Sequence, residues 1–150
     1  MRNNSPLVAL ERHHWALLHI CEELEMAADD LPDRLEPARC AKLVRATLTT
    51  LADAHAGEER LLFPMLAAAA PLDLAPVARR LRQEHETDQA AAEELKEALL
   101  SFAEGRPFLS TDAMGYLLRS FFEGVRRHVR SEQELVTLLL DFAGHKGSMH

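Results

Sequence analysis

The pattern of apolar and polar residues divides the chain into four long segments that share a helical period. Within each segment, apolar side chains recur at steps of three and four residues, which gathers them on one face of a helix. Turn-forming and helix-breaking residues cluster between the segments, over 29–37, 67–76 and 104–111. We therefore predict helices over 6–29, 37–66, 74–103 and 111–142. Because the loops are short, the expected fold is an all-α, antiparallel up-down-up-down four-helix bundle.

The predicted helix boundaries carry residues that are typical of helix ends. Pro37 and Pro76 suit the first turn of the second and third helices, where a missing backbone N–H costs nothing. Ser110 or Thr111 is expected to cap the fourth helix. Pro64 is expected to end or bend the second helix, because its ring clashes with the preceding turn.

Length and composition indicate one ordinary globular domain. The chain has 150 residues, of which 47% are apolar and 27% are charged, and it contains only six glycines and seven prolines. We expect the folded domain to span 1–143. The segment 144–150 has no packing pattern, and we predict that it is a flexible C-terminal tail.

Charge and cysteine content argue against several classes of partner. The formal net charge of −7 disfavours a nucleic-acid partner, because phosphate neutralisation needs a basic face. No stretch approaches the roughly 20 apolar residues of a membrane span, and no signal-peptide pattern opens the chain, so no membrane partner is expected. Cys21 and Cys40 make no disulfide framework, which favours reduced thiols in a cytoplasmic protein. No motif identifies a protein partner.

Ionisable residues interrupt the apolar face of every predicted helix. Two interruptions are single histidines, and two are His-x-x-x-Glu pairs whose members lie one turn apart and point inward from one face. The interrupting residues are His14, His55, Glu59, His85, His128 and Glu132. Such groups are costly in a core, so each needs a partner. Measured from the midpoints of the predicted loops, groups on neighbouring helices lie within about 2–8 Å of one another along the bundle, at ~1.5 Å rise per residue.

This set of side chains predicts a metal site. Imidazole with carboxylate suits iron or manganese, and the lack of cysteine ligands argues against structural zinc. Two inward carboxylates among four histidines indicate two metal ions bridged by Glu59 and Glu132. Each metal would keep terminal histidines and an open position. A single His-x-x-x-Glu pair is weak evidence, whereas two pairs with two further histidines at one level are strong evidence.

Other polar residues close to these positions have both a functional and an ordinary explanation. His13 and His19 lie off the apolar faces, and we expect both to face solvent. Glu11 and Glu58 are either hydrogen-bonding partners that orient a ligand histidine or solvated residues. Asp88 shares the face of the third-helix histidine and is a candidate extra ligand or hydrogen-bond acceptor.

Three stretches match motifs of a known family. The most specific is HAGEERLLFP at 55–64, and the others are LERHH at 10–14 and Glu-His at 84–85. With these stretches the sequence resembles the hemerythrin-like family, also called the HHE cation-binding domain, in which His-x-x-x-Glu is followed by Leu-Phe-Pro. The resemblance covers nearly the whole chain, from Leu10 to about Phe142.

The resemblance implies a non-haem di-iron protein whose ligands are His14, His55, Glu59, His85, His128 and Glu132. It implies two iron ions that are oxo- or hydroxo-bridged when oxidised, with manganese or zinc as substitutes. The expected function is to bind O2, NO or peroxide in sensing, iron homeostasis or stress protection. The chain differs from oxygen-carrying hemerythrins, because Gln89 stands one turn after the third-helix histidine and the last carboxylate is a glutamate four residues after its histidine. Both differences argue against reversible oxygen carriage.

Two other classes of function stay open. A di-iron oxidase or peroxide-consuming enzyme would use similar metals, but ferritin-like enzymes carry a pair of Glu-x-x-His motifs and this chain has one, at 11–14. A metal-free signalling or adaptor bundle would need an exposed histidine on a helix flank, whereas these histidines lie on apolar faces. The sequence therefore favours a metal- and diatomic-binding protein over an enzyme, without identifying a substrate.

Overall fold

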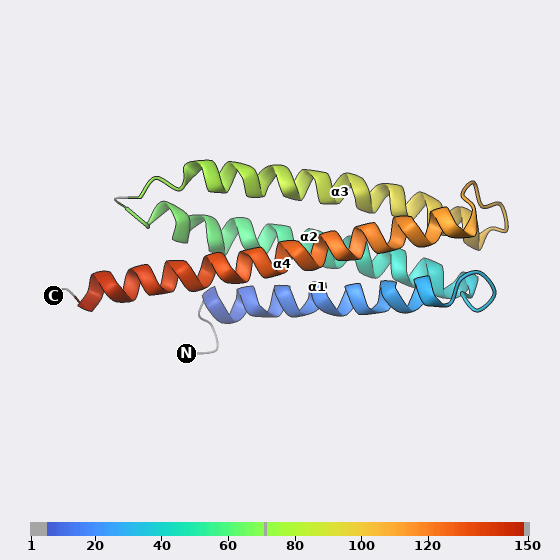
Figure 1. Cartoon of the computed structure of the whole chain (residues 1–150), viewed down its shortest axis with the longest axis horizontal. Coiled ribbons are helices and arrows are strands. Elements are labelled where there is room, and N and C mark those ends of the chain that lie inside the picture. Colours follow the sequence, from blue (N-terminus) through green and yellow to red (C-terminus); the bar gives the residue numbers. More distant parts are fainter. Residues whose placement is uncertain (1–5, 71, 149–150) are drawn as a thin grey trace.

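Four long α-helices make up the described part of the chain in this computed structural model, which covers residues 6–70 and 72–148 (Figure 1). The helices are α1 (Pro6–Asp29), α2 (Pro37–Ala67), α3 (Ala75–Ala103) and α4 (Thr111–Ser148). No strand occurs among the described residues. The predicted all-α four-helix fold is therefore confirmed.

The helices pack side by side, and the chain reverses direction at each connection (Figure 1). Contacts between α1 and α4 show this reversal. His14, in the first half of α1, meets Glu132 in the second half of α4, whereas Asp29, at the end of α1, meets Arg119 near the start of α4. Short connections between consecutive helices favour this arrangement.

The helix ends agree with the sequence signals, except at Pro64 and at the C-terminal end of α4. Pro37 and Pro76 lie in the first turn of α2 and α3. Ser110 Oγ accepts a hydrogen bond from the backbone N–H of Ala113 at 3.1 Å, which caps α4. Pro64 does not end α2, because the helix continues past it. Proline removes the hydrogen bond from its own nitrogen and crowds the preceding turn, and α2 ends within one turn after it, at Ala67.

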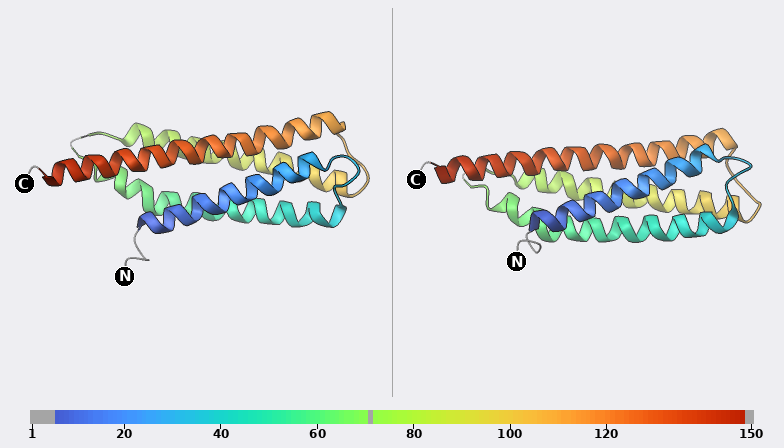
Figure 2. Two further views of the ribbon diagram at one scale, coloured as in Figure 1. Left: turned by 60° about the horizontal axis from the view of Figure 1, so that its bottom comes forward. Right: turned by 90° about the horizontal axis from the view of Figure 1, so that it is seen from below.

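The C-terminal end of α4 differs from the prediction. The predicted helix stops at 142 and is followed by a flexible tail, whereas the observed helix continues to Ser148. Figure 2 shows these last turns extending past the first turn of α1. No proline follows Phe142, so nothing in the sequence interrupts the backbone hydrogen bonds of the helix. Residues 149–150 lie outside the described part, and the domain boundary at 143 stays a prediction.

The core consists of two apolar clusters on either side of a polar layer. The larger cluster includes Leu24, Leu95 and Phe122 and fills the half of the bundle that contains the α1–α2 and α3–α4 connections. The smaller cluster includes Leu10 and Leu62. Each buried large apolar side chain stabilises the fold by roughly 1.5–3 kcal/mol. Polar side chains between the two clusters therefore lie in a layer that is shielded from water at both ends.

Two further expectations concern the cysteines and the membrane. Cys21 and Cys40 are buried free thiols, in agreement with the prediction that they form no disulfide. Among the described residues, no helix combines the length and apolar character needed to cross a membrane.

Candidate metal centre

Polar side chains from all four helices meet in the layer between the apolar clusters. His14 of α1 lies with its Nε2 3.0 Å from Oε2 of Glu132 on α4. His85 of α3 lies with its Nε2 2.6 Å from Oε2 of Glu58 on α2. The bundle thus brings together ionisable groups that are far apart in the sequence, and each finds its partner on another helix.

Three of these side chains form a compact group of potential metal ligands. Ligand atoms of His14, Glu58 and Glu132 all lie within 4.8 Å of one another, and all three residues are buried. Atoms that bind one ion at ~2.0–2.2 Å lie up to roughly 4.4 Å apart, so the observed separations need only small adjustments. The group is suited to hold a cation.

The structure places Glu58, rather than Glu59, inside this group. The Glu58 side chain is 2% exposed. The Glu59 side chain is 42% exposed, with Oε1 3.5 Å from Nε of Arg82 and Oε2 3.7 Å from Nδ1 of His85. The expected position of Glu59 on the buried face is therefore corrected to the rim of the layer. Its role as a ligand stays a prediction.

The rotation of α2 about its own axis explains why Glu58, rather than Glu59, points into the polar layer. The buried positions in the middle of the helix include Glu58 but not Glu59; they are Thr47, Leu51, Ala54, His55, Gly57, Glu58 and Leu62. Relative to His55, Glu58 and Glu59 lie on opposite sides, by about 60° and 40° at about 100° per residue. Both are thus compatible with an inward face that contains His55. Packing against the other helices turns the Glu58 side inward.

His55 and His85 bring two imidazole rings together within the layer. Their ring centroids are 4.0 Å apart and their planes are 13° from parallel. Burial, together with the neighbouring His85, lowers the pKa of His55 to about 4, so His55 is neutral. Nδ1 of both rings is buried and has no hydrogen-bond partner among the described residues. A neutral imidazole such as that of His55 can bind a metal ion, and coordination through a buried unpaired nitrogen would remove the cost of leaving it unpaired.

His128 lies at the edge of the layer, where it is bonded to α3. Its side chain is 25% exposed, its Nδ1 lies 2.7 Å from Oδ2 of Asp88, and its Nε2 lies 3.3 Å from Oε2 of Glu84. The hydrogen bond to Asp88 raises the pKa of His128. Carboxylates therefore hold both ring nitrogens of His128 in place.

Burial also changes the proton affinity of the two inward glutamates. The pKa of Glu58 is raised to about 7 and that of Glu132 to about 8, in both cases mainly because burial penalises the charged carboxylate. The hydrogen bond between the two carboxyl groups lowers the pKa of Glu58 and raises that of Glu132, which favours the proton on Glu132. A metal ion entering the layer would displace such protons.

Two histidines outside the predicted ligand set have different surroundings. His19 is exposed, as expected, 3.8 Å from Glu23. His13 is half-buried, so the expectation that it faces solvent is wrong. Its ring packs on α2 at Gly57, where an added Cβ would lie 2.2 Å from Nε2 of His13. The glycine therefore lets the ring approach the backbone of α2.

Two members of the layer are absent from the predicted ligand set, Glu58 and Asp88. Each stands three residues after a predicted histidine, His55 and His85 respectively. A spacing of three keeps two side chains on one helix face, as a spacing of four does. This spacing is the signal in the sequence that points to Glu58 and Asp88 as members of the polar layer, and it makes Asp88 a candidate metal ligand.

Buried imidazole and carboxylate groups at one level of four helices define a class of protein, a helical bundle with an internal cation-binding layer. The family model of the hemerythrin HHE cation-binding domain matches residues 5–139. Because this match covers most of the chain, the chain belongs to that family, and cation binding is the property that membership implies. No curated protein and no solved structure matches the chain. The family resemblance of the sequence is confirmed.

Proposed function

We propose that the chain is a hemerythrin-like, non-haem di-iron protein. The observation that carries the proposal is the buried layer in which four helices contribute imidazole and carboxylate groups. The proposed ligands are His14, His55, His85, His128, Glu132, Glu58 and Glu59. Glu132 and Glu58 would bridge the two ions, whereas Glu59, at the exposed rim beside His85, would be a weak ligand whose loss leaves most of the metal bound.

The choice of iron follows from the donor atoms. Mixed imidazole and carboxylate ligands without cysteine suit iron, with manganese or zinc as substitutes. When bound, iron supplies a redox-active ion with a position for a small ligand. The chain supplies the neutral imidazole of His55, the two carboxyl groups of raised pKa and the apolar surroundings that keep water from both ends of the layer.

A cavity between α1 and α4 has room for a small ligand. Its volume is about 280 Å³, and its lining combines four apolar residues with four polar ones, which are Leu7, Leu10, Val136 and Leu140 with Glu11, His14, Gln133 and Thr137. A cavity of this size that reaches a ligand histidine suits a small ligand such as O2, NO or peroxide. We therefore propose that the protein binds O2, NO or peroxide, and that it acts in sensing, iron homeostasis or protection from oxidative or nitrosative stress.

The experiment combines metal analysis with spectroscopy of protein from iron-supplemented cells. We expect about two irons per chain and, in the oxidised protein, absorption bands of oxo-to-iron charge transfer. Stoichiometric changes of the spectrum with NO, O2 or peroxide would support a binding protein, whereas steady peroxide consumption would favour the enzymatic alternative. Purified protein that contains neither iron nor manganese and takes up none would contradict the proposal and favour the metal-free bundle.

A further inference from the structure

Asp88 of α3 lies between two histidines that come from other helices. Its Oδ2 is 2.7 Å from Nδ1 of His128 on α4 and 3.9 Å from Nε2 of His55 on α2. The Asp88 side chain is only 14% exposed. A mostly buried carboxylate that faces two imidazoles has the surroundings of a metal ligand rather than of a solvated surface residue.

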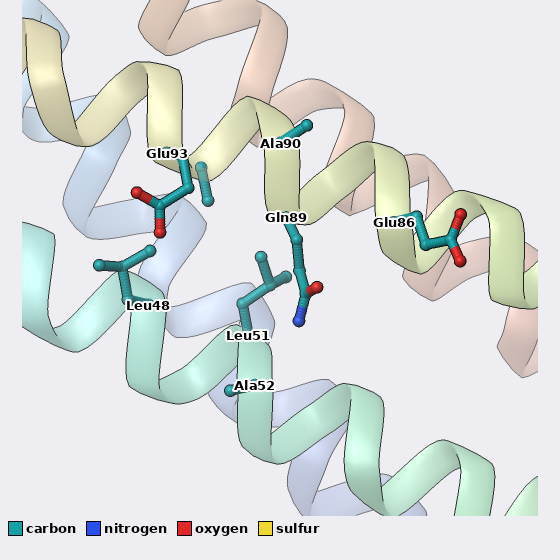
Figure 3. Close-up of a pocket in the computed structure, with 8 residues that line it drawn as sticks. Leu48, Leu51, Ala52, Glu86, Gln89, Ala90 and Glu93 are labelled. Atoms are coloured by element: carbon teal, nitrogen blue, oxygen red, sulfur yellow. The ribbon is translucent and has the colours of Figure 1, made fainter.

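The register of α3 makes Asp88 the inward residue after His85. Asp88 follows that histidine by three positions and shares its face. The next residue, Gln89, extends instead into a groove between α2 and α3, beside Leu51 and Ala52 (Figure 3). The side chain that α3 adds to the polar layer after His85 is therefore a carboxylate.

His55 gives a second, independent sign that this part of the layer holds a cation. Its ring is buried, and its Nδ1 has no hydrogen-bond partner among the described residues. Its Nε2 faces Asp88 at 3.9 Å, which is beyond hydrogen-bond distance. Two ligand atoms that bind one ion at ~2.0–2.2 Å lie up to roughly 4.4 Å apart, so Nε2 of His55 and Oδ2 of Asp88 are placed to bind the same ion.

We propose that Asp88 is a metal ligand, and that with His55 and His128 it forms the second metal position of the centre. This inference rests on the proposed function, since it assigns ligands within the same layer. Two histidines with one carboxylate are a donor set that holds ferrous iron with open coordination positions. The other position is formed around His14, Glu58 and Glu132, and these two glutamates would bridge to the Asp88 position. The two metal ions would thus differ in their terminal ligands.

The test is the Fe(II) stoichiometry of Asp88→Asn, measured anaerobically by elemental analysis after gel filtration. Asparagine keeps the size of the side chain and an oxygen that accepts a hydrogen bond from His128, but it lacks the negative charge of a ligand carboxylate. We expect this variant to bind about one ion per chain where the parent binds about two. Glu86→Gln is the matched control, because it removes one negative charge from an exposed position on the same helix and should leave the stoichiometry unchanged.

Asp88→Glu, which keeps the carboxylate, should recover part of the lost ion, and circular dichroism of each variant without metal checks that it is folded. If Asp88→Asn binds as much Fe(II) as the parent, Asp88 only orients His128 and the inference is wrong, while the proposed function stands. If the parent itself binds no metal, the proposed function fails first, and the inference fails with it.

Discussion

Glu58→Gln and Glu59→Gln test which carboxylate of α2 holds the metal. Each variant replaces a carboxylate by an amide of nearly equal size, and the two positions are neighbours on one helix, so each controls for the other. Glu58 is buried, with its Oε2 2.6 Å from Nε2 of His85. Glu59 is exposed and lies 3.5 Å from Arg82. We therefore expect the Glu58 variant to be the more damaging of the two.

The expected magnitude follows from the loss of one metal ligand. If the affinity falls by about 100-fold, the metal-dependent stabilisation falls by about 2.7 kcal/mol. For a chain of this length, 1 kcal/mol shifts Tm by roughly 2–4 °C, so the loaded Glu58→Gln protein should melt about 5–10 °C below the parent. Glu59→Gln removes an exposed ion pair worth at most about 1 kcal/mol and should keep most of its metal.

The assay is thermal unfolding of the parent and both variants, with and without added Fe(II), together with the metal content of each. The metal-dependent part of Tm should nearly disappear in Glu58→Gln and persist in Glu59→Gln. The opposite ranking, with Glu59→Gln losing the metal and Glu58→Gln keeping it, would refute the reasoning. It would mean that α2 is rotated in the loaded protein so that the carboxylate implied by the family motif faces the ions.

Three other predictions follow from contacts and pKa values around the layer. Because the pKa of Glu58 is about 7 and that of Glu132 about 8, metal binding at pH 7 should release roughly one proton per chain, and the metal affinity should weaken as the pH falls. Calorimetry in buffers of different ionisation enthalpy measures the number of protons released. Metal uptake that does not depend on pH between 6 and 8 would contradict the prediction. Gly57→Ala should stabilise the fold by about 0.5–1 kcal/mol in a His13→Ala background, because alanine favours the helix. In the parent the new Cβ would meet the His13 ring, so no stabilisation is expected there. A double-mutant cycle measured by urea unfolding tests this, and equal effects of Gly57→Ala in the two backgrounds would contradict the contact. Burial raises the pKa of Cys21 to about 12, so little reactive thiolate is present at pH 8. Iodoacetamide at pH 8 should therefore alkylate Cys21 on the order of 1,000-fold more slowly in the folded than in the unfolded protein. Mass spectrometry of the modified peptide measures both rates.

Helix boundaries illustrate how far local signals extend. The start of α2 at Pro37 and the cap of α4 at Ser110 follow from chemistry confined to one turn, and both agree with the structure. The loss of an apolar pattern predicts that α4 ends at 142, but the helix continues to Ser148. Packing patterns report where a helix is buried, whereas the helix can continue beyond its buried part where nothing interrupts its backbone hydrogen bonds.

The sequence by itself determined the four helices, their alternating direction and the level at which ionisable groups meet, because these depend on periodicity, on loop length and on a rise of ~1.5 Å per residue. It could not decide between Glu58 and Glu59, nor establish that Asp88 contacts His55 and His128. Those outcomes depend on the rotation of each helix about its axis, by a few tens of degrees. That rotation is set by side chains on the other three helices, so only the tertiary structure decided which carboxylates point inward.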